Sequence, residues 1–382
     1  MSKIQKYIYL DYNSTTPIDP RVLEAMLPFL RDNFANPSST HHLGQSINEK
    51  VKQAREQIAD FINAEPNELI FTSGATEAIN MAIKGVAESY SNKGKHIITV
   101  STEHKAVLDT CKDLERKGFE ITYLPVQTNG LIDLDELTQA FKPETILVSV
   151  MHVNNETGVI QPIKEISSLV REKGALFLTD ATQAVGKIDI DVNDLGIDLL
   201  CFSGHKMYAP KGIGALYVRN KTKLTSQIQG GGHERGLRSG TLNVPGIIAL
   251  AKACEIANQE MTQNKKNISE LRDILERELL KLPNTSLNGD TENRIFNTIN
   301  ICFIGQDANV LIGRMKEIAV SNGSACSSEV FEPSHVLNSI GLNDEDALAS
   351  LRFSLGKYNT VEDIETVVNK IKELTQPNFK YA

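Results

Sequence analysis

The strongest constraint on the fold is an alternation, between residues 68 and 218, of short apolar runs with longer segments of helical spacing. Apolar residues recur at helical spacing in the segments 75–87, 107–117, 132–141 and 163–173. The apolar runs between these segments predict strands at 68–72, 96–100, 120–124, 145–151, 175–180, 197–202 and 214–218. Strands that alternate with helices of this length form a mostly parallel sheet with helices on both faces. The predicted class is therefore α/β.

The pattern changes on either side of this region. Before it, residues 7–11 predict a short strand, 20–30 a helix and 36–44 a polar loop. After Gly246, the sequence predicts one or two helices over 247–282, a strand at 294–304, a helix at 310–316 and further helices from residue 334. We expect a large domain over 15–260 and a smaller α+β domain built from 1–14 and 261–382.

Composition excludes several classes of function. The net charge of −8 argues against direct binding of nucleic acid. No apolar run is long enough to span a bilayer, and the first residues contain no apolar signal region, so we expect a cytoplasmic protein without a membrane partner. Five scattered cysteines indicate reduced thiols rather than a disulfide framework or a paired zinc site.

In parallel sheets of this kind the site lies beyond the carboxyl ends of the strands. Lys206 follows such a strand end, in the sequence Ser-Gly-His-Lys. A partly desolvated lysine there can have a lowered pKa and form an imine with an aldehyde. Taken alone, a solvated loop lysine is the commoner outcome.

Two further strand ends carry polar groups. Residues 73–77, Ser-Gly-Ala-Thr-Glu, open a helix whose free N–H groups, with the hydroxyl of Thr76, can bind an anion, although such residues are often only helix caps. Asp180 ends an apolar strand, where a carboxylate needs a partner such as a protonated heterocyclic nitrogen. Gln183 is placed to contact a neighbouring oxygen. An N-cap role for Asp180 is an equal alternative.

Together these groups predict a site for pyridoxal phosphate. The helix start, Ser203 and His205 offer a phosphate grip, Asp180 a counter-ion for the ring nitrogen, and Lys206 an amine for the aldehyde. His104, at another strand end, is a candidate for stacking on the ring or carrying protons, with a structural histidine as the alternative. No Walker or Gly-x-Gly-x-x-Gly motif supports a nucleotide instead.

Three features lie outside these strand ends. Cys326 stands among small polar residues, which is typical of an exposed, reactive thiol, whereas the cysteines at 111, 201, 254 and 302 lie in apolar segments. The glycine-rich loop 230–241 is a candidate phosphate nest or a subunit contact. Arg352 is a candidate partner for a substrate carboxylate.

The chain resembles the cysteine desulfurases of the NifS/IscS type, which are fold-type I pyridoxal-phosphate enzymes of the class-V aminotransferase family. The resemblance runs nearly end to end. It rests on motifs in order at matching spacing, at residues 9–12, 36–39, 72–77, 102–107, 152–156, 180–183, 203–206, 238–241, 323–326 and 352–354. It implies a mostly parallel seven-stranded sheet with helices on both faces, a smaller α+β domain, and a mobile cysteine loop at about 319–335.

The resemblance also implies roles for individual residues. Cys326, Lys206 and His104 are the expected catalytic residues: Lys206 holds the cofactor covalently, His104 stacks on its ring, and Cys326 takes sulfur from cysteine as a persulfide and releases alanine. The expected substrate ligands are Asn155 and Arg352. The residues implied to bind the cofactor are Ala75, Thr76, His104, Asp180, Gln183, Ser203, His205, Lys206 and Thr241.

Thr241 is expected to reach the phosphate of a neighbouring subunit, so the resemblance implies a homodimer. It further implies that sulfur passes to an iron–sulfur scaffold or another acceptor protein, for iron–sulfur cluster assembly or tRNA thiolation. In that case Cys326 could ligate a metal cluster shared with the scaffold. The alternative function is a selenocysteine lyase or another aminotransferase of the same fold.

Overall fold

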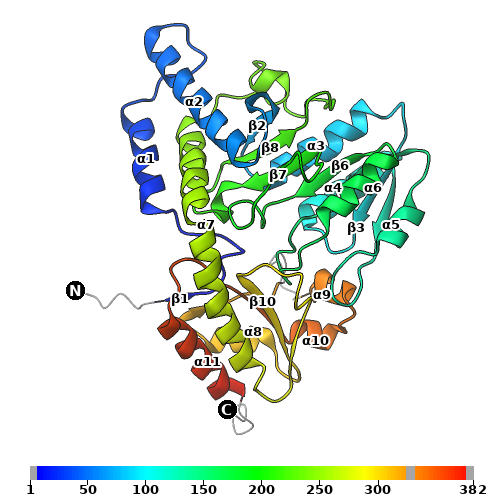
Figure 1. Cartoon of the computed structure of the whole chain (residues 1–382), viewed down its shortest axis with the longest axis vertical. Helices are drawn as coiled ribbons and strands as arrows, with labels where there is room; N and C mark the ends of the chain where they lie inside the picture. The colour runs from blue at the N-terminus through cyan, green and yellow to red at the C-terminus, as the bar shows by residue number, and fades with distance from the viewer. Residues whose placement is uncertain (1–6, 324–331, 376–382) are drawn as a thin grey trace.

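The computed structural model describes residues 7–323 and 332–375, and a seven-stranded sheet lies at its centre (Figure 1). The strand order is β2-β8-β7-β6-β5-β3-β4, and every strand except β8 runs in the same direction. This confirms the predicted mostly parallel α/β sheet. The strands are β2 (Leu69–Thr72), β3 (His96–Val100), β4 (Glu120–Leu124), β5 (Thr145–Ser149), β6 (Leu176–Asp180), β7 (Leu199–Ser203) and β8 (Gly214–Val218).

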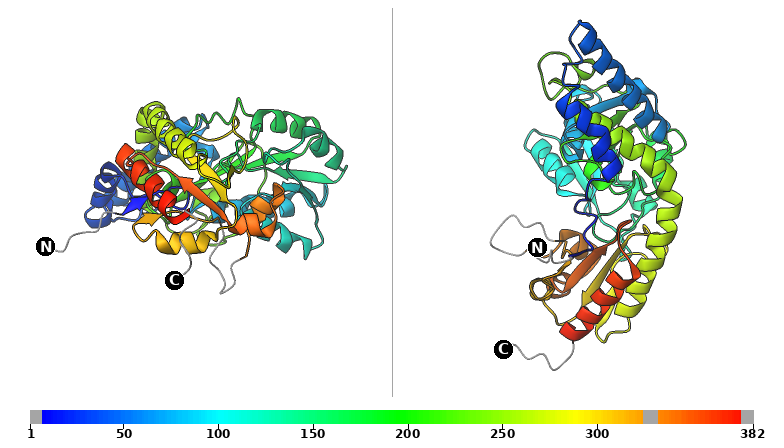
Figure 2. Two further views of the ribbon diagram at one scale, coloured as in Figure 1. Left: turned by 90° about the horizontal axis from the view of Figure 1, so that it is seen from below. Right: turned by 90° about the vertical axis from the view of Figure 1, so that its left-hand side faces the viewer.

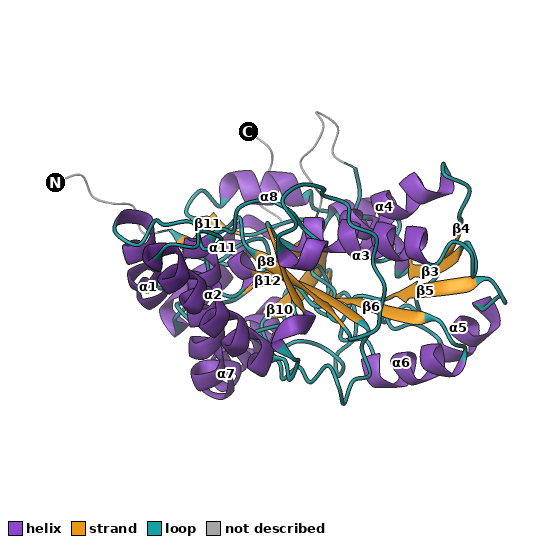
Figure 3. Ribbon diagram, turned by 90° about the horizontal axis from the view of Figure 1, so that it is seen from above, coloured by secondary structure: helices purple, strands orange, loops and turns teal. Residues whose placement is uncertain are grey.

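Helices cover both faces of this sheet (Figure 3). In β7, Leu199 and Cys201 face the core beneath α3 and α4, whereas Leu200 and Phe202 face the core shared by α2, α6 and α7. Successive strand residues point to opposite faces, so a strand buried on both sides must be apolar throughout. The helices of this unit are α1 (Pro20–Arg31), α2 (His42–Phe61), α3 (Ala75–Ser89), α4 (Lys105–Glu115), α5 (Leu134–Ala140), α6 (Ile163–Glu172) and the first part of α7 (Val244–Leu279), with single turns at η1 (Pro66–Glu68), η2 (Gly204–Lys206) and η3 (Glu234–Gly236).

A second, smaller unit surrounds the antiparallel sheet β12-β10-β9 (Figure 2). The chain's first strand joins this unit, because β1 pairs in parallel with β11. Helix α7 contacts α1 and α2 of the large unit and also β10 and α11 of the small one. The domain boundary expected after residue 260 lies inside α7. The elements are β1 (Ile8–Tyr9), β9 (Thr285–Leu287), β10 (Thr298–Phe303), α8 (Ala308–Arg314), β11 (Ile318–Ala319), α9 (His335–Ser339), α10 (Asp344–Leu348), β12 (Ser350–Ser354) and α11 (Val361–Thr375).

The structure differs from the predicted pattern at helix α2 and at strand β12. Helix α2 begins at His42, inside the expected loop 36–44, because the ring nitrogen Nδ1 of His41 accepts from Gly44 N at 3.1 Å and caps the helix. The segment 247–282, for which one or two helices were predicted, lies mostly in the single helix α7. Residues 350–354, where further helices were expected, form strand β12, because they pair with β10, about fifty residues earlier in the chain.

None of the helices in the described ranges is long and apolar enough to cross a membrane.

Candidate active site

The carboxyl ends of strands β2, β3, β5, β6 and β7 lie at one edge of the sheet and border a cavity of about 560 Å³. Ten of the twelve residues predicted for the site line this cavity, although they come from distant parts of the chain. They are Ala75, Thr76, His104, Asn155, Asp180, Gln183, Ser203, His205, Lys206 and Arg352.

The start of helix α3 forms one wall of the cavity. Gly74, with φ of 156°, turns the chain from β2 into the helix, a conformation that favours glycine. Gly214 of β8 packs directly beneath it, since a Cβ on Gly214 would lie 2.7 Å from the Gly74 Cα atom. The first N–H groups of a helix have no partner within the helix, so those of Ala75 and Thr76 are suited to an anion.

Two side chains from the end of β7 adjoin this helix start. A Cβ on Gly74 would lie 3.4 Å from Ser203 Oγ, so the serine hydroxyl borders the same space. His205 Nδ1 lies 3.1 Å from Thr15 Oγ1. Burial and the charge of Lys206 lower the pKa of His205 to about 4, which keeps the ring neutral at physiological pH.

The amine of Lys206 is held by backbone oxygens rather than by a carboxylate. Its Nζ atom donates to the carbonyl oxygens of Asn13 and Ser14, each at 2.6 Å. Burial and the nearby Arg352 lower the pKa of Lys206 to about 8, although Asp11 and Asp180 act in the opposite direction. An amine with this pKa is partly neutral near physiological pH and is therefore a competent nucleophile.

Asp180 and Gln183 lie at the end of β6. Asp180 is 6% exposed, and one carboxylate oxygen accepts from Thr182 N at 2.9 Å. The carboxylate therefore stabilises the following turn and also lines the cavity, so the two roles that the sequence left open are compatible. Gln183 is 4% exposed and donates from Nε2 to the Asn13 carbonyl oxygen at 2.9 Å.

His104 is exposed at the start of helix α4 and lines the cavity. Its Nδ1 atom accepts from Ala106 N at 3.0 Å and so caps the helix. Because this bond already fixes the ring, its face and its Nε2 atom can contact a group in the cavity with little further loss of side-chain entropy.

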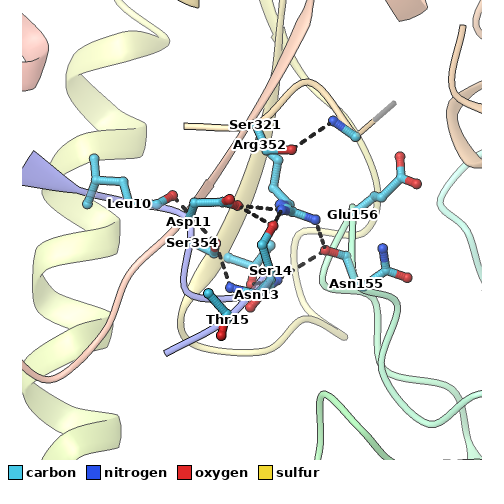
Figure 4. Close-up of polar contacts among 12 residues, drawn as sticks. Leu10, Asp11, Asn13, Ser14, Thr15, Asn155, Glu156, Ser321, Arg352 and Ser354 are labelled. Atoms are coloured by element: carbon cyan, nitrogen blue, oxygen red, sulfur yellow. Dashed lines mark hydrogen bonds and ion pairs between the residues drawn. The ribbon is translucent and has the colours of Figure 1, made fainter. Parts of the chain in front are cut away.

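Arg352 of β12 connects the small unit to this edge of the large sheet (Figure 4). Its guanidinium group donates to Asp11 Oδ1 at 2.5 Å, to Ser14 Oγ at 2.7 Å and to the Asn155 carbonyl oxygen at 3.0 Å. The residue is 4% exposed, and within the described residues its Nε atom has no partner. Arg352 also lines the cavity, so its guanidinium is placed to donate hydrogen bonds to a carboxylate there.

Thr241 does not line this cavity. Thr241 is exposed on the loop after η3, which is attached to α3 by an ion pair of 2.7 Å between Arg238 and Glu77. Cys326 lies outside the described residues. The chain re-enters the described structure close to the site, where Ser334 donates to the buried Glu156 at 2.5 Å.

The other four cysteines are free and buried, as their apolar segments predicted: Cys111, Cys201, Cys254 and Cys302. In the part of the chain that the structure describes, no group of three His, Cys, Asp or Glu side chains is arranged to hold a metal ion.

The N-terminal segment contributes a part of the site that the sequence patterns do not predict. Asp11, Asn13 and Ser14 lie between β1 and α1 and contact both Lys206 and Arg352. The only signal in the sequence is a polar, turn-rich stretch after an apolar run, and the two backbone carbonyls have no residue type that could reveal them.

Comparison with known proteins agrees with this geometry. The model of the aminotransferase class-V family matches residues 8–367. Cysteine desulfurase IscS of Pectobacterium carotovorum subsp. carotovorum (strain PC1) is 53% identical over 371 residues, which are 96% of this chain and 92% of the relative. A solved NifS-like protein superposes with a TM-score of 0.91 at 39% identity, covering 96% of this chain and 99% of its own. Another, described as SspA in complex with cysteine, has a TM-score of 0.81 at 41% identity, covering 92% and 100%.

Fold and site thus define a pyridoxal-phosphate enzyme of fold type I, and the chain belongs to the class-V aminotransferase family, among its IscS and NifS-like cysteine desulfurases. The residues present fit the cofactor of this family. A helix start with free N–H groups, a buried carboxylate and an amine of lowered pKa face one cavity of about 560 Å³.

Proposed function

We propose that this chain is a cysteine desulfurase that converts L-cysteine to L-alanine and retains the sulfur as a persulfide on Cys326. The observation that carries the proposal is the shared cavity of Lys206, Asp180 and the start of α3. The cysteine desulfurases and the cysteine complex among its relatives support the substrate.

Each end of the cofactor has a partner in the proposed arrangement. The N–H groups of Ala75 and Thr76, with Ser203 and His205, hold its phosphate. Asp180 pairs with the ring nitrogen, Gln183 with the ring oxygen, and His104 lies against the ring, while Lys206 binds the aldehyde carbon. When bound, pyridoxal phosphate serves as an electron sink for the attached amino acid.

Arg352 and Asn155 hold the substrate carboxylate in this proposal. The ion pair to Asp11 fixes the guanidinium in place, so that substrate binding costs little further ordering. The free amine of Lys206, with a pKa of about 8, would be able to accept a proton and return it beside the substrate.

Cys326 performs the sulfur transfer. Its thiolate forms an S–S bond with the substrate sulfur while the C–S bond breaks, and the carbon keeps the electron pair and takes up a proton to give alanine. The persulfide then passes to an acceptor protein, which we propose to be an iron–sulfur scaffold or another sulfur acceptor. Cys326 would ligate a metal cluster only while the scaffold protein is bound and shares that cluster.

We further propose a homodimer. Thr241 is exposed and does not line its own cavity, which leaves it free to serve the partner's phosphate site. Helix α1 and the residues after it carry exposed apolar side chains at helical spacing, a surface that association would cover: Leu23, Leu27, Leu30 and Phe34 are 42%, 40%, 56% and 79% exposed. We also propose two domains, a large one over 15–260 and a small one over 1–14 and 261–382. The proposed location is the reducing cytoplasm, which the free thiols support.

The test combines absorbance with alanine release. Purified protein with pyridoxal phosphate should show a visible band that is absent in Lys206→Ala, and it should release alanine from cysteine. Cys326→Ala should keep the band and lose alanine release, even with a reductant present. Cys254→Ala, at a buried cysteine in α7, is the matched control and should keep both.

Full alanine release by Cys326→Ala would refute the proposed sulfur transfer. A much faster reaction with selenocysteine, or formation of pyruvate, would instead assign the chain to a lyase or an aminotransferase of the same fold.

A further inference from the structure

A second lysine lies behind the candidate site and is not among the residues assigned above. Lys187 follows Gln183 by four residues, and its Nζ atom donates to Gln183 Oε1 at 2.7 Å. It is partly buried, and it lines a small cavity of about 30 Å³ together with Lys206. Within the described residues no carboxylate pairs with Lys187. Placing an amine here without a counter-ion is costly, so its contact with the Gln183 amide calls for an explanation.

The contact decides which end of the Gln183 amide is which. In its protonated form the lysine amine can only donate, so the atom that it touches must be the amide oxygen. The Asn13 carbonyl oxygen, which can only accept, requires the same orientation. The amide nitrogen then donates one hydrogen to the Asn13 carbonyl oxygen at 2.9 Å. The second hydrogen on this nitrogen is left for the cavity that Gln183 lines. Lys187 and the Asn13 carbonyl oxygen together orient Gln183 so that it faces an occupant of the cavity as a donor and not as an acceptor.

The same contacts link the two lysines. The Asn13 carbonyl oxygen accepts from Gln183 and also from Lys206 Nζ, at 2.6 Å. Burial and the charges of Lys206 and Arg352 lower the pKa of Lys187 to about 7. A change at Lys187 is thus transmitted to Lys206 by charge and through one shared acceptor.

We propose that Lys187 is a positioning residue that fixes the amide of Gln183, so that its N–H group donates to the phenolic oxygen of bound pyridoxal phosphate. The inference rests on the proposed function, since it concerns the same cofactor. Two bonds hold this orientation of the amide, one from Lys187 and one to the Asn13 carbonyl oxygen. Without Lys187 only the second remains, so the amide turns over more readily and presents its oxygen, which repels the phenolate. A phenolate that has lost a donor is more basic, and its basicity favours the protonated form of the adjoining lysine–cofactor linkage.

The readout is the pH midpoint of the visible band of the bound cofactor. Other charged groups that act on Lys206 stay unchanged in the comparison: Arg352, Asp11, Asp180 and Lys211. In Lys187→Met we expect the midpoint to rise by about one pH unit relative to the wild type. Lys187→Arg keeps the donor and the charge, so its midpoint should return to within a few tenths of a unit of the wild-type value.

A matched control separates charge from orientation. Lys211 lines the cavity, is exposed, and also lowers the pKa of Lys206 by its charge, but no hydrogen bond joins it to Gln183 in the described structure. Lys211→Met should therefore shift the midpoint by less than half as much as Lys187→Met. If Lys187→Met does not fold, as judged by its thermal transition, Lys187→Leu carries the same expectation.

An unchanged midpoint in Lys187→Met would overturn the inference, as would a shift that Lys187→Arg fails to reverse or that Lys211→Met equals. Failure of the proposed function looks different. In that case the wild-type protein itself shows no visible band with pyridoxal phosphate, and no midpoint exists to compare.

Discussion

Arg352→Gln should raise the pH at which Lys206 reacts with the aldehyde of pyridoxal phosphate. In the wild-type protein, burial and the guanidinium of Arg352 both disfavour the ammonium form of Lys206 and lower its pKa to about 8. A lowered lysine pKa means that the neutral, reactive amine is present at lower pH. Removing the guanidinium takes away the second of these causes and also frees Asp11, whose charge raises the pKa of Lys206. Both changes act in the same direction.

The magnitude follows from the two pKa values. At pH 7.5 an amine with a pKa of about 8 is about one-quarter neutral, whereas at the ordinary value for a lysine the neutral fraction is about 0.1%. At pH 7.5 the neutral, reactive amine is therefore about 200-fold more abundant in the wild-type protein than in an unperturbed lysine. For Arg352→Gln we expect the midpoint to move up by about one pH unit, which lowers the rate at pH 7.5 several-fold.

The assay is the initial rate of appearance of the visible band when apo-protein is mixed with pyridoxal phosphate, measured between pH 6.5 and 10. Lys206→Ala should show no band. Arg277→Gln, at an arginine of α7 whose side chain is 60% exposed, controls for the loss of one positive charge elsewhere.

A wild-type midpoint near the ordinary lysine value would refute the reasoning about burial. A wild-type midpoint near 8 that Arg352→Gln leaves in place would refute the role of the guanidinium and leave burial as the sole cause.

Two substitutions test the supports of the site. Gly214→Ala places a Cβ 2.7 Å from the Gly74 Cα atom, so we expect the free energy of unfolding, measured by denaturation, to fall by about 1–3 kcal/mol. Binding of pyridoxal phosphate, measured by absorbance titration, should also weaken. Unchanged affinity would show that the helix start tolerates the displacement. Glu234→Ala removes the ion pair of 2.5 Å to Arg55 and should lower the free energy of unfolding by about 3 kcal/mol. The double variant Glu234→Ala, Arg55→Ala should lose less stability than the sum of the two single variants. Strict additivity would contradict the pairing.

Most of the large sheet could be predicted from the sequence because its elements are local. Strand and helix patterns repeat over a few residues each, and the strands from β2 to β8 all fall within or close to the expected ranges. Strand β12 and the pairing of β1 with β11 could not be predicted in this way, because each depends on a partner strand far along the chain. Helix α2 was partly hidden by a polar start whose cap comes from His41.

In the site, too, some groups could be predicted from local sequence and others could not. The rule that ligands bind at the carboxyl ends of parallel strands selected Thr76, His104, Asp180 and Lys206, and all four line one cavity. The same rule could not reveal the carbonyl oxygens of Asn13 and Ser14, because a backbone acceptor carries no signature in residue type.

Local periodicity and the chemistry of single side chains are enough to predict the α/β class and the edge of the sheet where the site lies. They also predict the amine, carboxylate and anion-binding groups that are gathered there. The positions and charge states of those groups depend on how the chain folds. The lowered pKa of Lys206, the ion pair of Arg352 with Asp11 and the contact of Lys187 with Gln183 all depend on burial and on distances between segments remote in the chain, which no local pattern contains.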